Sequence, residues 1–304
     1  MSVPIRQQFD VAMYMMKQKI MGNKRYPLVL MLEPLFRCNL ACPGCGKIDY
    51  PPEILNQRLS VEDCLNAAEE CGAPIVSIPG GEPLIHREMP QIVEGLIKQG
   101  RHVYLCTNAL LLDKKMDDYK PSQYLTLSVH LDGLGDDHDK AVNKKGVYEI
   151  AERAIINAVA RGFNVNINAT LFNNADPERT AVFFDRMMEI GLNAIMLSPG
   201  YAYERAADQD HFLNRDTTKN IFRKLLALGK ERKGKKKWRF SQSSLFMDFL
   251  CGNQTYECTP WGTPTYNVFG WQRPCYLLGE GFVKTYKELI EDTEWEKYGT
   301  GRYE

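Results

Sequence analysis

Six short hydrophobic runs recur along the chain, and segments with helical periodicity separate them. The runs are typical of β-strands at residues 28–35, 74–80, 102–108, 124–133, 164–172 and 194–200. In the segments between them, such as VEDCLNAAEECG, apolar residues recur every three or four positions, and a glycine often closes the segment. Repeated strand–helix units predict parallel strands joined by right-handed crossovers. The pattern therefore predicts an α/β fold, as a partial (β/α)6 barrel or an open sheet.

The fourth and fifth runs are apolar on one face and polar on the other. Their polar faces carry Thr126, Ser128, His130, Asp132, Asn164, Asn166, Asn168 and Thr170. Successive side chains point to opposite faces of a strand, so the apolar face should pack on helices while the polar face lines an interior. A cavity that holds water and a polar ligand satisfies these groups. The alternative is a pair of exposed antiparallel strands, which the intervening helices disfavour.

Composition places the chain among ordinary globular proteins and excludes some classes of function. Of 304 residues, 44% are hydrophobic and 25% charged, and 38 basic residues balance 38 acidic ones. This balance argues against a general nucleic-acid binder. The sequence shows no apolar run of transmembrane length and no signal-peptide pattern at its start. Nine cysteines without an export signal indicate thiols and metal ligands in a reducing cytoplasm.

Three cysteines follow the first strand within the stretch FRCNLACPGCGKI. Cys38, Cys42 and Cys45 lie after the carboxyl end of that strand, where barrels of this kind place their chemistry. Three thiolates suit an iron–sulfur cluster that leaves one iron open to a ligand. The alternatives are a zinc site with Cys64 or Cys71 as fourth ligand, or plain buried cysteines.

The cysteine spacing C-x3-C-x2-C and the stretch PGGEPL (79–84) together resemble the radical S-adenosylmethionine (SAM) superfamily. The resemblance implies a [4Fe-4S] cluster on the three cysteines and SAM as ligand of its open iron. Gly80 and Gly81 allow close backbone approach, and Glu82 can pair with the methionyl ammonium. The resemblance also implies that Asn108, Ser128 and Asn168 contact the ribose or the methionine carboxylate.

The stretches SVHLDG, SPGYAYERAADQDHFL and CTPWGTPTYNVFGWQRPCYLLGEGF resemble the adenosylhopane synthase family of hopanoid biosynthesis. The superfamily resemblance implies a partial (β/α)6 radical SAM barrel at 26–230, which leaves a helix at 1–25 and an irregular C-terminal extension at 231–304. The adenosylhopane synthase resemblance implies that a 5′-deoxyadenosyl radical adds to the terminal alkene of the triterpene diploptene. SAM is then a co-substrate, and a flavodoxin or ferredoxin supplies electrons. A peptide- or small-molecule-modifying radical SAM enzyme is the alternative.

The radical left after such an addition needs a hydrogen atom. In HVYLCTN, Tyr104 and Cys106 alternate onto the lumen face of the third strand, and Cys106 lies at its carboxyl end. A thiol S–H bond is weaker than the C–H bond that forms at a tertiary carbon. We therefore expect Cys106 to donate, with Tyr104 as second candidate. The alternative is that Cys106 is a small buried hydrophobe.

Two basic segments bear on a lipid substrate. In the first 25 residues, Phe9, Met13, Met16 and Ile20 share one helical stripe, with basic residues around it. This amphipathic helix either lies in a membrane interface, at the inner membrane face, or caps the barrel with its apolar face in the core. The basic run KERKGKKKWR (230–239) either meets anionic headgroups or forms a solvated loop.

The C-terminal extension carries the spacing C-x11-G-x4-C through Cys258, Gly270 and Cys275. It resembles half of the pattern that binds an auxiliary iron–sulfur cluster in many radical SAM enzymes. Cys251 is a further candidate ligand. The alternative is that all three cysteines are structural.

Overall fold

The computed structural model describes residues 3–201 and 210–298. Its six central strands are parallel and follow one another in chain order across the sheet. They are β1 (Val29–Glu33), β2 (Ile75–Ile78), β3 (His102–Thr107), β4 (Leu125–His130), β5 (Asn164–Leu171) and β6 (Ala194–Pro199). Each lies inside one of the six expected runs, so the predicted parallel arrangement is confirmed. The antiparallel alternative for the fourth and fifth runs is wrong.

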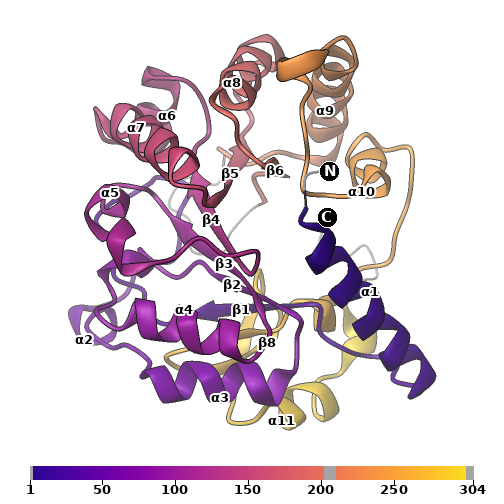
Figure 1. Cartoon of the computed structure of the whole chain (residues 1–304). Helices are drawn as coiled ribbons and strands as arrows, with labels where there is room; N and C mark the ends of the chain where they lie inside the picture. Colours follow the sequence, from indigo (N-terminus) through magenta and orange to yellow (C-terminus); the bar gives the residue numbers. More distant parts are fainter. Residues whose placement is uncertain (1–2, 202–209, 299–304) are drawn as a thin grey trace.

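Helices follow the strands and cover their outer side (Figure 1). The principal ones are α3 (Val61–Cys71), α4 (Met89–Lys98), α7 (Val147–Ala160), α8 (Pro177–Ile190) and α9 (Arg215–Lys230), and shorter ones are α2 (Pro52–Leu55), α5 (Leu112–Lys115), α6 (Asp136–Ala141) and α10 (Ser244–Leu250). Short 3-10 turns are η1 (Pro83–Ile85), η2 (Met116–Asp118), η3 (Gly234–Lys236), η4 (Pro260–Gly262) and η5 (Trp295–Lys297). Gly72 and Gly191 end α3 and α8 in the left-handed conformation, as the glycine pattern predicted.

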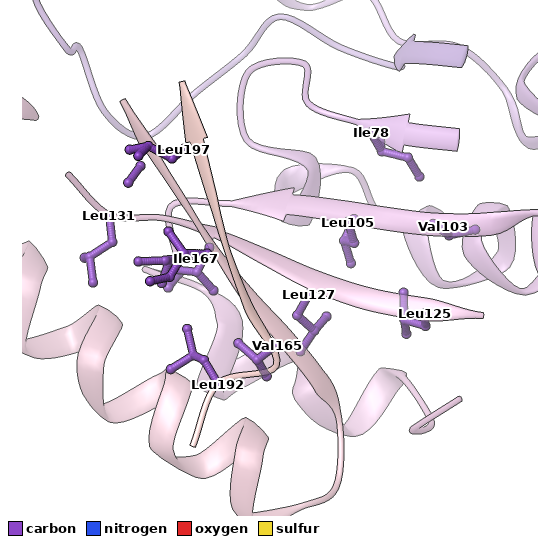
Figure 2. Packing of buried hydrophobic residues seen from close by; sticks show 14 of the residues in the cluster. Ile78, Val103, Leu105, Leu125, Leu127, Leu131, Val165, Ile167, Leu192 and Leu197 are labelled. Carbon is purple, nitrogen blue, oxygen red and sulfur yellow. The ribbon is translucent and has the colours of Figure 1, made fainter. Parts of the chain in front are cut away.

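The main core lies between the outer face of the strands and these helices. Its side chains come from the apolar positions of the strand alternation, and Figure 2 shows Val103, Leu105, Leu127, Val165 and Ile167 among them. Full burial of such a side chain contributes about 1.5–3 kcal/mol. Because the apolar face of each strand packs against the helices, the side chains at the alternate positions must face the lumen.

The C-terminal extension continues the same sheet. Its strand β7 (Thr265–Asn267) pairs in parallel with β1, and β8 (Gly270–Pro274) and β9 (Gly279–Val283) follow antiparallel. Helix α11 (Tyr286–Glu291) packs against β8 and α3. The extension therefore lies beside the strand that precedes the three cysteines.

Helix α1 (Ile5–Ile20) lies apart from the outer helices (Figure 1). Gln7 exchanges hydrogen bonds with Tyr104, and Asp10 lies 3.0 Å from His102 Nε2. His102 is the first residue of β3, so α1 covers the amino end of that strand. None of the described helices has the length and apolar content that crossing a bilayer requires.

Candidate active site

The three cysteines lie together in the loop that leaves β1. All three are partly buried, and Cys45 N donates to Cys42 O at 3.0 Å. Burial, together with negative charge on Cys45 and Cys38, raises the pKa of the Cys42 thiol to about 12. The thiols are therefore close enough to act on one another, as a shared ligand requires.

The donor set fits an iron–sulfur cluster better than a single ion. Among the described residues, no three His, Cys, Asp or Glu side chains are arranged to hold one metal ion. Cys64 and Cys71, the candidates for a fourth zinc ligand, lie on α3 in the main core. Cys38 and Cys42 instead pack against a separate small cluster around Leu40. The zinc alternative therefore lacks its fourth ligand, whereas a cluster takes each thiolate at a different iron.

The glycine motif after β2 is bonded to the start of the cysteine loop. Gly81 N donates to Leu35 O and Glu82 N donates to Arg37 O, each at 2.9 Å. A Cβ at Gly81 would lie 2.3 Å from Arg37 O, and one at Gly80 would lie 2.6 Å from Leu35 O. Gly80 also has a φ of 53°. Only glycine permits this contact between the two loops.

Glu82 is buried and joins the glycine motif to the loop after β3. Its carboxylate accepts from Leu84 N at 3.1 Å, Thr107 Oγ1 at 2.8 Å and Asn108 N at 2.9 Å. Burial raises its pKa, and these donors act against that rise. An ionised carboxylate accepts about four hydrogen bonds, so about one position remains for a ligand cation. The expected pairing with the ammonium of SAM stays a prediction.

Asn108 extends the connection to the cysteines. Its Nδ2 donates to Asn39 Oδ1 at 2.7 Å and lies 3.8 Å from Cys38 Sγ. Its Oδ1 accepts from Leu110 N, and the following Ala109 has a φ of 64°, which is rare for a residue with a Cβ. The loop after β3 is thus fixed against the cluster loop.

Cys106 faces the lumen at the carboxyl end of β3. Its Sγ lies 3.5 Å from Ser77 Oγ, and it stands beside Ser128 in the register of β3 and β4. Cys106 is the only residue of β3 that is not fully buried. Burial raises the pKa of its thiol, so the sulfur keeps its hydrogen at neutral pH. Asn168, partly exposed on β5, pairs in register with His130.

Tyr104 lies on the same face but nearer the amino end of the strand. It is buried, and its hydroxyl both donates to and accepts from Gln7 of α1. The structure therefore brings Cys106, Ser128 and Glu82 near one another but places the Tyr104 hydroxyl against α1.

The pair of His130 and Asp132 was not singled out from the sequence as a site. His130 Nε2 lies 2.8 Å from Asp132 Oδ2, and Asp132 Oδ1 accepts from Thr170 N. Burial acts to lower the pKa of His130, but Asp132 raises it overall. Burial acts to raise the pKa of Asp132, but His130 lowers it overall. A pocket of about 270 Å³ opens beside this ion pair, with Phe172 and His211 in its wall.

A second pair, also missed from the sequence, fixes the far end of the cysteine loop. Lys47 Nζ lies 3.0 Å from Glu33 Oε1, a carboxylate that is fully buried at the end of β1. The ammonium also lies 4.2 Å from the ring centre of Tyr276 in the extension. Glu33 and Lys47 are 14 residues apart and Tyr276 lies in the extension, so no local motif joins the three.

The remaining sequence predictions fall on the surface and in the extension. Cys258 is exposed and Cys275 partly buried, and they are close enough that Cys275 adds to the burial-induced rise in the pKa of Cys258. Cys251 lies in the main core, which favours a structural role for it. In the basic run 230–239, Arg232 and Lys236 pair with Asp185 and Glu189 of α8. The stretch 202–209 of the motif SPGYAYERAADQDHFL lies outside the described residues.

The family model of the radical SAM superfamily matches residues 32–187, about half of the chain. The match runs from the end of β1 through β5 and includes the three cysteines. The chain belongs to the radical SAM superfamily. This superfamily uses a [4Fe-4S] cluster and SAM, and the partly buried thiols and the glycine motif are the residues that would hold them. A second model, a domain of unknown function (DUF3463), matches residues 195–304.

Curated relatives in the superfamily match part of the chain. Fe-coproporphyrin III synthase of Methanosarcina barkeri is 27% identical over 50% of this chain and 39% of its own length. Mycofactocin maturase MftC of Mycolicibacterium smegmatis is 30% identical over 45% of this chain and 36% of its own. The chain thus spans well under two thirds of the length of these relatives.

Solved structures confirm the fold over a larger share of the chain. Streptococcus suis SuiB bound to S-adenosylmethionine has a TM-score of 0.68 at 15% identity, over 83% of this chain and 60% of its own. Native anSMEcpe with bound AdoMet and Cp18Cys peptide has a TM-score of 0.62 at 18% identity, over 90% of this chain and 82% of its own. At these identities the likeness concerns the fold alone.

Proposed function

We propose that this radical SAM enzyme is an adenosylhopane synthase, which joins C5′ of the adenosyl group to the terminal alkene carbon of diploptene. When bound, the cluster and SAM supply a 5′-deoxyadenosyl radical through reductive cleavage of the carbon–sulfur bond. The proposal draws on the resemblance of three separate stretches to that family and on the position of one lumen thiol. A reductant of the flavodoxin or ferredoxin class would deliver the electrons.

The chain's own residues orient the reactants. Cys38, Cys42 and Cys45 would hold the cluster, and the backbone bonds of Gly81 and Glu82 to the same loop would fix the SAM site relative to it. Ser128 on β4 and Asn168 on β5 would offer polar groups to the ribose and carboxylate of SAM. Such contacts would hold the ligand in one orientation.

The observation that carries the proposal is the protonated thiol of Cys106 in the lumen. Addition to the alkene forms one carbon–carbon bond, breaks the π bond and leaves a tertiary carbon radical. Cys106 gives that carbon its hydrogen atom, and the sulfur radical is restored by one electron and one proton from the reductant and solvent. A raised thiol pKa keeps the S–H bond in place for this transfer. Tyr104, whose hydroxyl is bonded to Gln7, is the weaker candidate.

A second candidate is a radical SAM enzyme that modifies a peptide or small molecule with the help of an auxiliary cluster. The proximity of Cys258 and Cys275 favours it. One test separates the two. The reconstituted enzyme is incubated without oxygen with SAM, reductant and diploptene. We expect adenosylhopane as product. Formation of 5′-deoxyadenosine alone, with diploptene unchanged, would reject the adenosylhopane assignment.

A further inference from the structure

Helix α1 exposes its apolar face. Ile5, Phe9, Met13, Met16 and Ile20 recur every three or four residues and form one stripe, and Phe9 is 59% and Ile20 79% exposed. In the part of the chain that the structure describes, fourteen large hydrophobic side chains are exposed, and seven of them lie within residues 5–21. A monomeric protein rarely concentrates its exposed apolar side chains in this way.

The opposite face of α1 contacts the rest of the protein through polar side chains and through the half-buried Val11 and Tyr14. Gln7 is buried and exchanges hydrogen bonds of 3.0 and 3.1 Å with Tyr104. Asp10 lies 3.0 Å from the buried His102. A surface helix usually turns its more apolar face to the core, whereas α1 exposes that face. Of the two alternatives from the sequence, packing of the apolar stripe in the core is wrong, because polar bonds attach the helix.

The rim of the stripe is basic. Residues 5–25 hold five Lys or Arg and one acidic residue, Asp10. Arg6 pairs with Asp10, and Arg25 pairs with Glu296. Among the described residues, Lys17, Lys19 and Lys24 are exposed and pair with no carboxylate. Lys17 and Lys19 flank the stripe on its two sides.

We infer that α1 is an interfacial helix that lies in the plane of a bilayer containing anionic lipids. The stripe enters the boundary between headgroups and acyl chains, and the lysines contact lipid phosphates. A second copy of the chain is a poorer partner, because a two-fold contact through the same stripe would bring together two segments that each carry net positive charge over residues 5–25. The inference rests on the surface of α1 and not on the proposed reaction.

The test is a vesicle flotation assay with the reconstituted full chain, without SAM or diploptene. We expect binding to vesicles of phosphatidylcholine with phosphatidylglycerol, and weaker, salt-independent binding to phosphatidylcholine alone. The double variant Phe9→Glu, Met16→Glu should bind at least about tenfold more weakly to either vesicle. Val182→Glu, which changes an exposed apolar residue of α8 to the same charge, is the matched control and should bind like the wild type.

A second variant tests the charge independently of the stripe. Lys17→Glu with Lys19→Glu should weaken binding to the anionic vesicles by about fivefold or more per lysine and change binding to neutral vesicles little. Wild-type protein that fails to float, or a Phe9→Glu, Met16→Glu variant that binds like the wild type, would overturn the inference. So would a wild-type dimer in solution that this variant converts to monomer.

The two proposals fail separately. If the enzyme makes adenosylhopane from detergent-solubilised diploptene yet does not bind vesicles, only the membrane inference is rejected. If it binds vesicles through α1 but leaves diploptene unchanged, only the proposed reaction is rejected.

Discussion

Replacing Glu82 by Gln separates two roles that the structure allows for this buried carboxylate. It accepts hydrogen bonds from Leu84 N, Thr107 Oγ1 and Asn108 N, with about one acceptor position left for the ammonium of SAM. A carboxamide keeps the size but turns one oxygen into a donor that meets another donor. An unsatisfied buried donor costs about 1–3 kcal/mol, so the free energy of unfolding should fall by that amount. The lost charge-assisted bond is worth about 1.5–3 kcal/mol, so SAM affinity should fall about ten- to a hundredfold.

The assay is anaerobic equilibrium binding of SAM, with iron content measured on the same samples and unfolding followed in denaturant. Thr107→Val is the matched control, because it removes one bond to the same carboxylate but leaves the negative charge. It should lower stability by about 1 kcal/mol and change SAM affinity by less than about fivefold. If Glu82→Gln binds SAM with wild-type affinity at full iron content, Glu82 does not bind SAM. Its role would then be only to join the glycine motif to the loop after β3.

Five further substitutions have distinct expected outcomes. Cys42→Ala should abolish iron content and visible absorbance. Cys251→Ala, in the core, should keep both and lower the free energy of unfolding by about 1 kcal/mol. Equal iron loss in both variants would contradict the assignment of Cys42 as a cluster ligand. Cys106→Ala should still form the carbon–carbon bond but give a mixed configuration by NMR, whereas Tyr104→Phe should keep one isomer; the reverse pattern would exchange their roles. Gly81→Ala places a Cβ 2.3 Å from Arg37 O. It should lower the free energy of unfolding by about 1–3 kcal/mol and reduce iron incorporation. Unchanged iron content would show that the glycine loop and the cysteine loop can separate without loss of the cluster.

The strand pattern predicted the sheet because it depends on local alternation. Each of the six runs formed a strand, and apolar positions such as Val165 and Ile167 packed against helices as their alternation required. The extension could not be placed in the same way. Strand β7 pairs with β1, which lies more than two hundred residues earlier, and no short-range pattern predicts that pairing.

The parts of the site that form short sequence motifs could be predicted, and the parts that depend on partners distant in sequence could not. The cysteine loop and glycine motif are visible as short stretches, but the three donors to Glu82 include two that lie about 25 residues away. The stripe of α1 was visible from its periodicity. The face of α1 that contacts the protein could not be predicted, because the partner of Gln7 is Tyr104 of β3, 97 residues later.

The central claim joins addition to an alkene with hydrogen transfer from Cys106, and one reaction in D2O tests both. A thiol exchanges its hydrogen with solvent, so the enzyme equilibrated in D2O carries deuterium on Cys106. Incubated with SAM, reductant and diploptene, it should yield adenosylhopane of single configuration with one deuterium at the tertiary carbon, as mass spectrometry and NMR detect. The Cys106→Ala variant should lose that single configuration. Unaltered diploptene beside 5′-deoxyadenosine, or adenosylhopane without deuterium, would contradict the account.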